Sequence, residues 1–257
     1  MSHDCRRSGK ITHVLRGLRM LIASPLGHVV EPPLQAFDDV TVVVATDEDE
    51  FTRAVAGQVR FDVVVADLIW NSPETEWTFD GLDVIDALTK HDRLAPVLLA
   101  TQGYGMEQDH LDEARLRPEV LGVVAKSDGL QALMESIRTV AYGQRLPFEP
   151  ATDRRRTPLY ELFVGQRGHT AGRLAGAIAS GASSDNVSLA RAAKVSPNTA
   201  NKVTSHYLGP IIERRGEHDD RLPMTQAAVY RWCGLHARYI VSWCRRHGHA
   251  DVLGELR

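Results

Sequence analysis

Cysteine is scarce in this sequence, which has only Cys5, Cys233 and Cys244 among 257 residues. An odd and sparse cysteine count argues against a disulfide-based scaffold and favours a reducing compartment, so we expect a cytoplasmic protein. Long apolar runs are also missing, and none approaches the roughly 18 residues that a membrane-spanning helix needs. The N-terminal residues MSHDCRRSGK have no apolar segment behind them, unlike a signal peptide. We expect residues 1–15 to be a disordered tail, and no membrane partner.

What the sequence does contain is an uneven distribution of charge. Residues 1–153 hold 14 lysines and arginines against 25 aspartates and glutamates, a net charge of −11. Residues 154–257 hold 16 basic and 8 acidic residues, a net charge of +8. The chain length favours two domains, and the charge split indicates that only the second half meets a polyanion. The alternative is that the acidic half simply keeps the protein in solution.

Five apolar segments, mostly rich in valine, predict β-strands in the first half, at 18–24, 40–45, 61–67, 96–101 and 120–126. They lack alternation, which is typical of strands that are covered on both faces. Helix-length segments separate the strands, most clearly at 48–57, 81–91 and 130–142. This order predicts an α/β domain with a doubly wound, five-stranded parallel sheet. Functional groups gather at the carboxyl ends of such strands, where the sequence has Asp67, Thr101 and Lys126.

Five motifs in this half carry a family resemblance: VVVAD (63–67), FDGLDVI (79–85), PVLLAT (96–101), VLGVVAKSDG (120–129) and LQALMESIRTVAYGQ (130–144). With them, residues 17–143 resemble the receiver domain of two-component response regulators, and we set this receiver-like domain at 16–143. The resemblance implies that Asp67 matches the phosphoacceptor. It also implies that Thr101 matches the hydroxyl that senses the phosphoryl group, and Lys126 the cation that pairs with it.

The phosphorylation site departs from the family pattern. A working receiver needs two acidic residues after the first strand to hold Mg²⁺, and this sequence has Ser24 and Pro25 there. Neither residue supplies the carboxylate oxygens that Mg²⁺ favours. Without the metal, the charge that develops during phosphoryl transfer loses its main stabiliser. The aromatic switch residue of the fifth strand is also replaced, by Val123. We therefore expect a degenerate receiver that needs no Mg²⁺-dependent phosphorylation and no cofactor.

Three interpretations of the phosphoacceptor-like pocket stay open; its residues are Ser24, Asp67, Thr101 and Lys126. Asp67 is a conventional phosphoacceptor, a structural carboxylate paired with Lys126, or part of a pocket for a small-molecule or protein signal. In the last case the long loop 68–78 would cover the strand ends with Trp70 and Trp77, because aromatic side chains suit a concave site. The alternative for both tryptophans is packing on the domain surface.

The segment 144–158 (QRLPFEPATDRRRTP) predicts a linker, because it is polar and contains three prolines. Its arginine triplet at 154–156 is either a solvated charge run or a contact to DNA phosphates. The rest of the chain, 159–257, is expected to form a second domain.

Within that domain, the segment 184–207 predicts a helix-turn-helix. Lys194 and Val195 form a tight turn, and Ser196 and Pro197 begin the second helix. A serine oxygen accepts from the free N–H groups of a first turn, and proline at the first helical position loses no hydrogen bond. A left-handed Lys194 would cost roughly 1–2 kcal/mol. Pro210 is expected to end or kink the second helix.

The second helix of this segment predicts a DNA-reading surface. Ala200, Val203 and Tyr207 recur at helical spacing and should face inward. Amide, hydroxyl, imidazole and cationic groups then face outward and suit base edges and phosphates. The candidate DNA contacts are Asn198, Thr199, Asn201, Lys202, Ser205 and His206, with Arg214 and Arg215 from the following insertion 209–224. The alternative for Asn198 and Thr199 is helix capping.

Two further helices are predicted around the helix-turn-helix, at 159–183 and 225–236. Gly172 and Gly176, spaced as GxxxG, indicate close helix packing. The motifs SLARAAKVSPNTANKVTSHYL (188–208) and TQAAVYRWCGLH (225–236) make residues 159–236 resemble the LuxR/NarL-type DNA-binding domain, a four-helix unit. The resemblance implies that the helix starting at Ser196-Pro197 enters the major groove. It also implies a dimer contact through the helix at 225–236, with Val229, Trp232 and Cys233.

The C-terminal extension 237–257 is expected to add a helix that extends a dimer interface or packs on its own domain. Cys233 with His236, and Cys244 with His247, have zinc-like local spacing. On one straight helix the two pairs would lie roughly 16 Å apart, which is too far for one ion with bonds near 2 Å. We therefore predict no metal site.

Taken together, these patterns predict a sequence-specific DNA-binding transcription regulator that acts as a homodimer on double-stranded DNA. The first alternative is a conventional regulator that is activated by phosphorylation at Asp67. The second is an interaction module whose receiver-like half binds a ligand or partner protein. An enzyme is not expected, because Asp67 and Lys126 lack metal ligands beside them.

Overall fold

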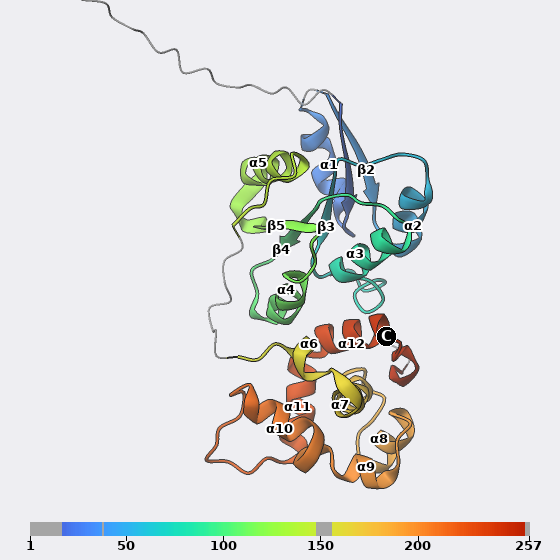
Figure 1. Cartoon of the computed structure of the whole chain (residues 1–257), viewed down its shortest axis with the longest axis vertical. Coiled ribbons are helices and arrows are strands. Elements are labelled where there is room, and N and C mark those ends of the chain that lie inside the picture. The colour runs from blue at the N-terminus through green and yellow to red at the C-terminus, as the bar shows by residue number, and fades with distance from the viewer. Residues whose placement is uncertain (1–16, 38, 148–155, 255–257) are drawn as a thin grey trace, which may run out of the picture.

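The computed structural model describes residues 17–37, 39–147 and 156–254, which form a sheet domain and a helical domain (Figure 1). The sheet domain, residues 17–147, has five parallel strands in the order β2-β1-β3-β4-β5. The strands are β1 (Leu18–Ala23), β2 (Val40–Ala45), β3 (Val63–Asp67), β4 (Val97–Thr101) and β5 (Val120–Ala125). Each observed strand lies within its predicted segment. The predicted tail at 1–15 lies outside the described residues.

Helices cover both faces of this sheet (Figure 1). On one face, α1 and α5 bury Leu34 and Met134 against the strand residues Met20 and Val65. On the other face, α2 and α3 bury their apolar side chains, while α4 follows β4. The helices are α1 (Gly27–Gln35), α2 (Glu48–Ala56), α3 (Gly81–Lys90), α4 (Gln108–Ala114) and α5 (Gly129–Ala141), with short 3₁₀ turns η1 (Gly105–Glu107) and η2 (Lys126–Asp128). The predicted doubly wound parallel sheet is confirmed.

The helical domain, residues 156–254, contains no strand among its described residues. Its elements are α6 (Leu159–Leu162), α7 (Gly165–Ala179), α8 (Asn186–Ala192), α9 (Pro197–Asn201), the π-helix η3 (Val203–Tyr207), α10 (Leu208–Arg214), α11 (Gln226–Leu235), α12 (Ala237–Arg246) and η4 (Ala250–Val252). The expectation of one continuous helix over 159–183 is wrong. The chain turns at Gly165, whose φ of 70° is left-handed, so α6 and α7 are separate. Across the described ranges, every helix is too short or too polar to span a bilayer.

The two glycines of the GxxxG pair allow α7 and α12 to pack closely, as the spacing predicts. A Cβ at Gly172 would lie 2.4 Å from the Trp243 ring, and one at Gly176 would lie 2.5 Å from Cys244 Sγ. Trp243 is buried and also packs on Phe163, with ring centroids 4.9 Å apart. Because Gly172 and Gly176 of α7 have no side chains, they leave the space that Trp243 and Cys244 of α12 fill.

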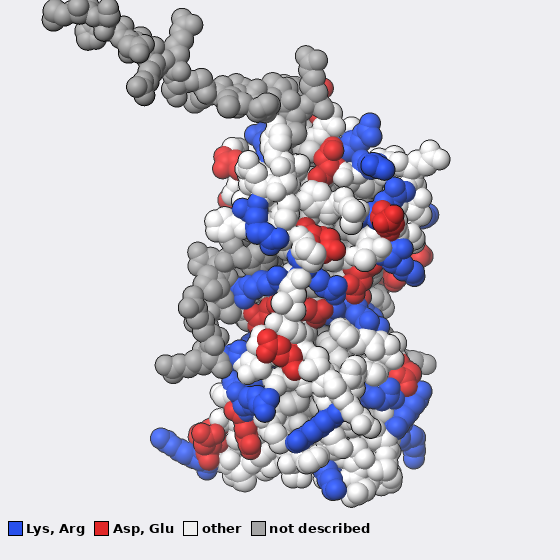
Figure 2. Space-filling model, viewed as in Figure 1, with Lys and Arg blue, Asp and Glu red and all other residues white. Residues whose placement is uncertain are grey.

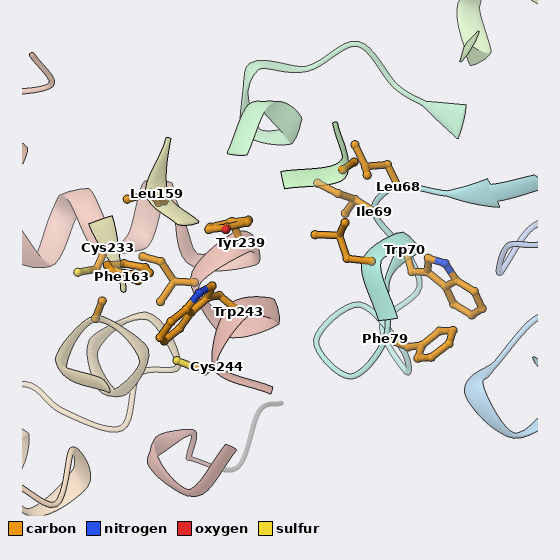
Figure 3. Packing of buried hydrophobic residues seen from close by; sticks show 14 of the residues in the cluster. Leu68, Ile69, Trp70, Phe79, Leu159, Phe163, Cys233, Tyr239, Trp243 and Cys244 are labelled. Atoms are coloured by element: carbon orange, nitrogen blue, oxygen red, sulfur yellow. The ribbon is translucent and has the colours of Figure 1, made fainter. Parts of the chain in front are cut away.

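Buried apolar residues of both domains belong to one cluster, part of which is shown in Figure 3. The sheet domain contributes Leu68, Trp70 and Phe79, and the helical domain contributes Tyr239 and Trp243. The Tyr239 ring meets His110 of α4 edge to face, with centroids 5.2 Å apart. Helix α12 thus packs on α7 with one side and faces the sheet domain with the other, so the helix of the C-terminal extension lies between the two domains.

We predict that Gly172→Ala destabilises the chain by about 1–3 kcal/mol, because the added methyl group overpacks the Trp243 site. Chemical denaturation monitored by tryptophan fluorescence measures this change. The matched control is Gly234→Ala in α11, where an added Cβ meets no atom within 4 Å. That variant should keep or raise stability, by up to about 1 kcal/mol of helix propensity. Equal free energies of unfolding for the two variants would show that α7 and α12 accommodate the added methyl group without loss of stability.

Candidate functional site

The carboxyl ends of three strands bring Ser24, Asp67 and Lys126 together in the sheet domain. Asp67 ends β3, Ser24 follows β1, and Lys126 follows β5. The Ser24 hydroxyl donates to Asp67 Oδ2 at 2.6 Å, and Lys126 Nζ donates to the same oxygen at 2.7 Å. Asp67 is only 6% exposed, so this carboxylate is compensated almost entirely by protein groups. The structure therefore has the Asp67–Lys126 pairing that one of the three interpretations expected.

The other groups of this pocket do not complete a phosphorylation site of the usual kind. Thr101 is buried, and its hydroxyl donates to the Val124 carbonyl at 3.5 Å. Among the described residues that line the pocket, Asp67 supplies the only carboxylate. The Ser24 hydroxyl donates its hydrogen to Asp67 Oδ2, and the Lys126 ammonium group donates to the same oxygen. Mg²⁺ prefers several oxygen ligands at once, so these residues do not fit that ion.

Burial controls the protonation of Asp67. Loss of water raises the pKa of this carboxyl above its ordinary value, while Lys126 and Ser24 oppose the increase. A nucleophilic carboxylate must be ionised, and here the ionised form depends on the neighbouring ammonium. The geometry fits a charge-neutral Asp67–Lys126 ion pair at the floor of an apolar pocket better than it fits a phosphoacceptor with a bound metal ion.

The tryptophans of loop 68–78 do not cover this pocket, which corrects the lid interpretation. Trp70 is fully buried and meets the Phe79 ring edge to face, with centroids 5.0 Å apart. Trp77 lies under the Arg238 guanidinium, 4.3 Å from the ring centroid. No residue of the loop lines the pocket within the described part of the chain. The loop instead faces α12, because its backbone accepts hydrogen bonds from arginines of that helix.

A set of buried ion pairs joins α4 to the helical domain; we call it the docking cluster. Its members on α4 are Asp109 and Glu113, and its members on the helical side are Arg156, Arg215, Glu217, His236, Tyr239 and Arg246. Asp109 Oδ1 accepts from Arg156 at 2.7 Å and from Arg215 at 2.9 Å. Its Oδ2 pairs with His236 Nδ1 at 2.7 Å. No local sequence pattern indicates this role of α4, because the partners of Asp109 are distant in the chain.

Glu113 forms the second centre of the docking cluster. Its carboxylate pairs with Arg246, and it accepts from the Tyr239 hydroxyl at 2.8 Å. Burial alone would raise the pKa of Glu113, but these partners lower it below its ordinary value. Nearby, Arg245 pairs with Asp80 at 3.1 Å and with Asp83. Helix α12 therefore contacts both α3 and α4 through charges that are largely removed from water.

The turn and helix start of the helix-turn-helix form as the residues predict. Lys194 adopts the left-handed conformation with φ of 52°. The Ser196 hydroxyl accepts from Thr199 N at 3.1 Å, and Pro197 occupies the first helical position of α9. The Thr199 hydroxyl also contacts Ser196, at 2.9 Å, which is the capping arrangement. Asp185 caps α8 in the same way, through Val187 N and Ser188 N.

Pro210 changes the course of the second helix without ending it. The chain continues helically through η3 and α10 to Arg214, with a π turn upstream of the proline. Proline lacks an N–H and its ring clashes with the carbonyl four residues back, which here belongs to His206. The guanidinium of Arg167 donates to that carbonyl instead, its Nε at 3.1 Å. An arginine of α7 thus replaces the helical donor that Pro210 removes.

The predicted DNA contacts divide into exposed and buried residues. The exposed ones are Asn198, Asn201, Lys202, Ser205, His206 and Arg214, whereas Thr199 is half-buried. Arg215 is a correction, because its side chain is buried against Asp109 and Glu217 and cannot reach DNA in this arrangement. Arg156 is likewise neither solvated nor free for phosphates, since it pairs with Asp109. Residues 154 and 155 lie outside the described residues.

The residues predicted to form a dimer contact face the interior. Val229, Trp232 and Cys233 are buried within the helical domain, so they belong to its core and not to a free surface. Trp232 also donates its indole N–H to Glu217 at 2.7 Å. Among the described residues, no three histidine, cysteine or acidic side chains are placed to hold a metal ion together. Cys233 and Cys244 are buried as thiols.

Comparisons with known proteins concern the fold. No family model matches the chain, and no curated protein matches it. Among solved structures, the RcsB response regulator of Salmonella typhimurium is similar, at 14% identity and a TM-score of 0.45, covering 85% of this chain and 98% of that chain. The receiver domain of the Francisella response regulator 1452 matches at 16% identity and a TM-score of 0.40, covering 49% and 98%. A response regulator receiver domain protein of Clostridium thermocellum matches at 19% identity and 0.41, covering 49% and 95%. With identities this low, none of these similarities transfers a function to the chain.

We predict that docking weakens as the pH rises through the neutral range, because of His236. Burial alone would lower the pKa of His236, but its hydrogen bonds with Asp109 and Glu217 raise it above 6.5. Arg215 and the Trp232 ring also lie beside this group. A raised pKa in the folded state gives stability that is complete below pH 6.5 and is lost as the pH passes the raised value.

Small-angle scattering of the full chain across this pH range measures the effect as an increase in the radius of gyration. His236→Gln should flatten the profile. His28→Gln is the matched control, since the exposed His28 pairs with the half-buried Glu31 on α1, away from the docking cluster. Identical profiles for the wild type and His236→Gln would exclude this histidine as the source.

Proposed function

We propose that this chain is a DNA-binding regulator that uses α9 and the start of η3 to read duplex DNA. The observation that carries the proposal is the polar outer surface of this helix, formed by Asn198, Asn201, Lys202, Ser205 and His206. All five side chains are exposed, while Ala200 and Val203 anchor the opposite side in the core. Short amides and hydroxyls with one cation form the set that reads base edges in a major groove.

Uncompensated charge around this surface supports a polyanionic partner. Arg191, Lys202 and Arg214 are exposed, and none forms an ion pair within the described residues. Figure 2 shows basic side chains over the end of the helical domain that carries α8 and α9. In Figure 1 these two helices lie at the end of the molecule farthest from the sheet domain. A duplex can therefore approach α9 without displacing the sheet domain.

We further propose that DNA binding is dimeric, with the dimer contact on the outer face of α11. The inner face is buried, and the outer face exposes Ala227, Arg231, Gly234 and Leu235, the last of these to 70%. Two recognition helices must lie about one helical turn, or roughly 34 Å, apart to enter successive major grooves. The docking cluster fixes where α11 and α12 lie relative to the sheet domain. Docking would therefore govern whether two copies reach that spacing.

We predict that Lys202→Ala and Asn201→Ala weaken DNA binding in different ways. Loss of the cation should lower affinity for all duplexes alike and reduce the slope of log K against log salt by about 1. Loss of the amide should cost about 1–3 kcal/mol only on the preferred sequence. The measurement is fluorescence anisotropy on duplexes selected from a random library, at several salt concentrations. Lys90→Ala on α3 is the control, and retained affinity in both test variants would remove α9 as the reader.

We predict that a small phosphodonor does not activate the chain. After treatment with acetyl phosphate and Mg²⁺, the intact mass and the affinity for the selected duplex should stay unchanged, because Asp67 lacks a partner carboxylate and is already paired with Lys126. An authentic receiver domain treated in parallel shows that the donor is active. A stoichiometric phosphoryl adduct that disappears in Asp67→Asn would contradict phosphorylation-independent control and favour the conventional mechanism.

A further inference from the structure

A cavity of about 280 Å³ lies directly above the Asp67–Lys126 pair. The ends of β1, β3, β4 and β5 form its base, and α1 and α5 form its walls. Small-molecule sites commonly measure about 300–1,000 Å³ and are mostly apolar with a few placed polar groups. This cavity is near the lower end of that range in size, so its occupant would be compact.

The walls of the cavity are almost entirely apolar. The apolar lining consists of Ile22, Leu26, Val29, Val65, Val124 and Leu133, with a few neighbours from the same elements. At its rim, Leu26, Val29 and Leu130 are 60%, 71% and 39% exposed. These rim side chains continue the apolar lining out to solvent, so an apolar molecule meets an apolar entrance. Water molecules in this cavity would form few hydrogen bonds with its walls. An apolar ligand that displaced them would therefore be favoured.

The polar base of the cavity selects the headgroup of such a molecule. Lys126 has three N–H donors, and its one hydrogen bond within the described residues goes to Asp67. Its side chain is 32% exposed, whereas that of Asp67 is 8% exposed. A headgroup that enters from solvent therefore meets the ammonium before the carboxylate. The free donors suit an acceptor with negative charge and repel a cation.

We propose that this cavity binds a small apolar carboxylic acid, with its hydrocarbon part between α1 and α5 and its carboxylate on Lys126. The assignment rests on the cavity, its apolar walls and the free donors of Lys126. It does not depend on DNA binding, because none of these residues belongs to the helical domain. The pocket that resembles a phosphorylation site would then sense a ligand and not a phosphoryl group.

The experiment titrates the full chain with octanoate, 1-octanol and octylammonium by isothermal titration calorimetry. Octanoate should bind at one site per chain, and octylammonium at least about tenfold more weakly or not at all, because it cannot accept the charged hydrogen bond from Lys126. Equal affinity for the three probes, or no binding of octanoate, overturns the proposal. DNA binding is not measured in this experiment, so its failure leaves the proposed DNA reader untouched.

Two variants separate the headgroup from the walls. Lys126→Gln should reduce octanoate affinity about tenfold, the loss expected for one charged hydrogen bond, while 1-octanol affinity stays the same. Val29→Asp places a negative charge on an exposed rim position, so the fold is kept and octanoate is repelled. Leu116→Asn, at an exposed apolar residue outside the cavity, is the control and should bind like the wild type. Unchanged affinity in both test variants overturns the site.

A second copy of the chain is the competing occupant of the exposed rim. Sedimentation velocity of the ligand-free chain decides between the two. A dimer that Val29→Asp converts to monomer, while octanoate does not bind, would make this face a contact between copies and overturn the ligand site. A monomer at all concentrations, or a dimer that Val29→Asp leaves intact, supports it.

Discussion

The arrangement of the two domains depends on the burial of one carboxylate, Asp109. This group is 3% exposed, and a lone buried charge would be strongly unfavourable. Two guanidinium groups and an imidazole of the helical domain side compensate it: Arg156, Arg215 and His236. Removing one partner of such a buried pair typically costs about 3–5 kcal/mol, because the remaining charge is left without compensation. Separating the domains without rehydrating Asp109 would therefore be costly, and the docked arrangement keeps its charge compensated.

This constraint explains why the charge split of the sequence does not divide cleanly into soluble and DNA-binding halves. The acidic excess of the first half includes Asp109 and Glu113, which neutralise Arg215 and Arg246 of the second half. Part of the basic excess of the second half is therefore neutralised by ion pairs inside the molecule. The cations that stay exposed around α8 and α9 form a smaller set than the composition suggests, and they alone bear on a polyanionic partner.

The sequence was sufficient to predict the helices and strands, but not the side-chain contacts between them. Val-rich runs and local signals such as Ser196-Pro197 act within a few residues, so the strands and the helix start were predictable. The burial of Arg215 and Val229 was not, because it depends on residues more than a hundred positions away or on which helix face meets the core. The site was predictable to the same extent: Ser24, Asp67 and Lys126 do meet, whereas the position of Trp70 and Trp77 follows from packing against Phe79 and Arg238.

The cavity and the docking cluster share one short connection. Gln102 lines the cavity, and its backbone N–H donates to the Glu107 carboxylate at 2.9 Å. Glu107 also accepts from Tyr104 N at 2.9 Å and directly precedes α4, the helix that carries Asp109. A ligand shifts a conformational equilibrium only by its difference in affinity for the two states. An occupant that displaces Gln102 would have such a difference if the Gln102–Glu107 hydrogen bond carries that displacement to α4, the helix that holds Asp109 against its partners.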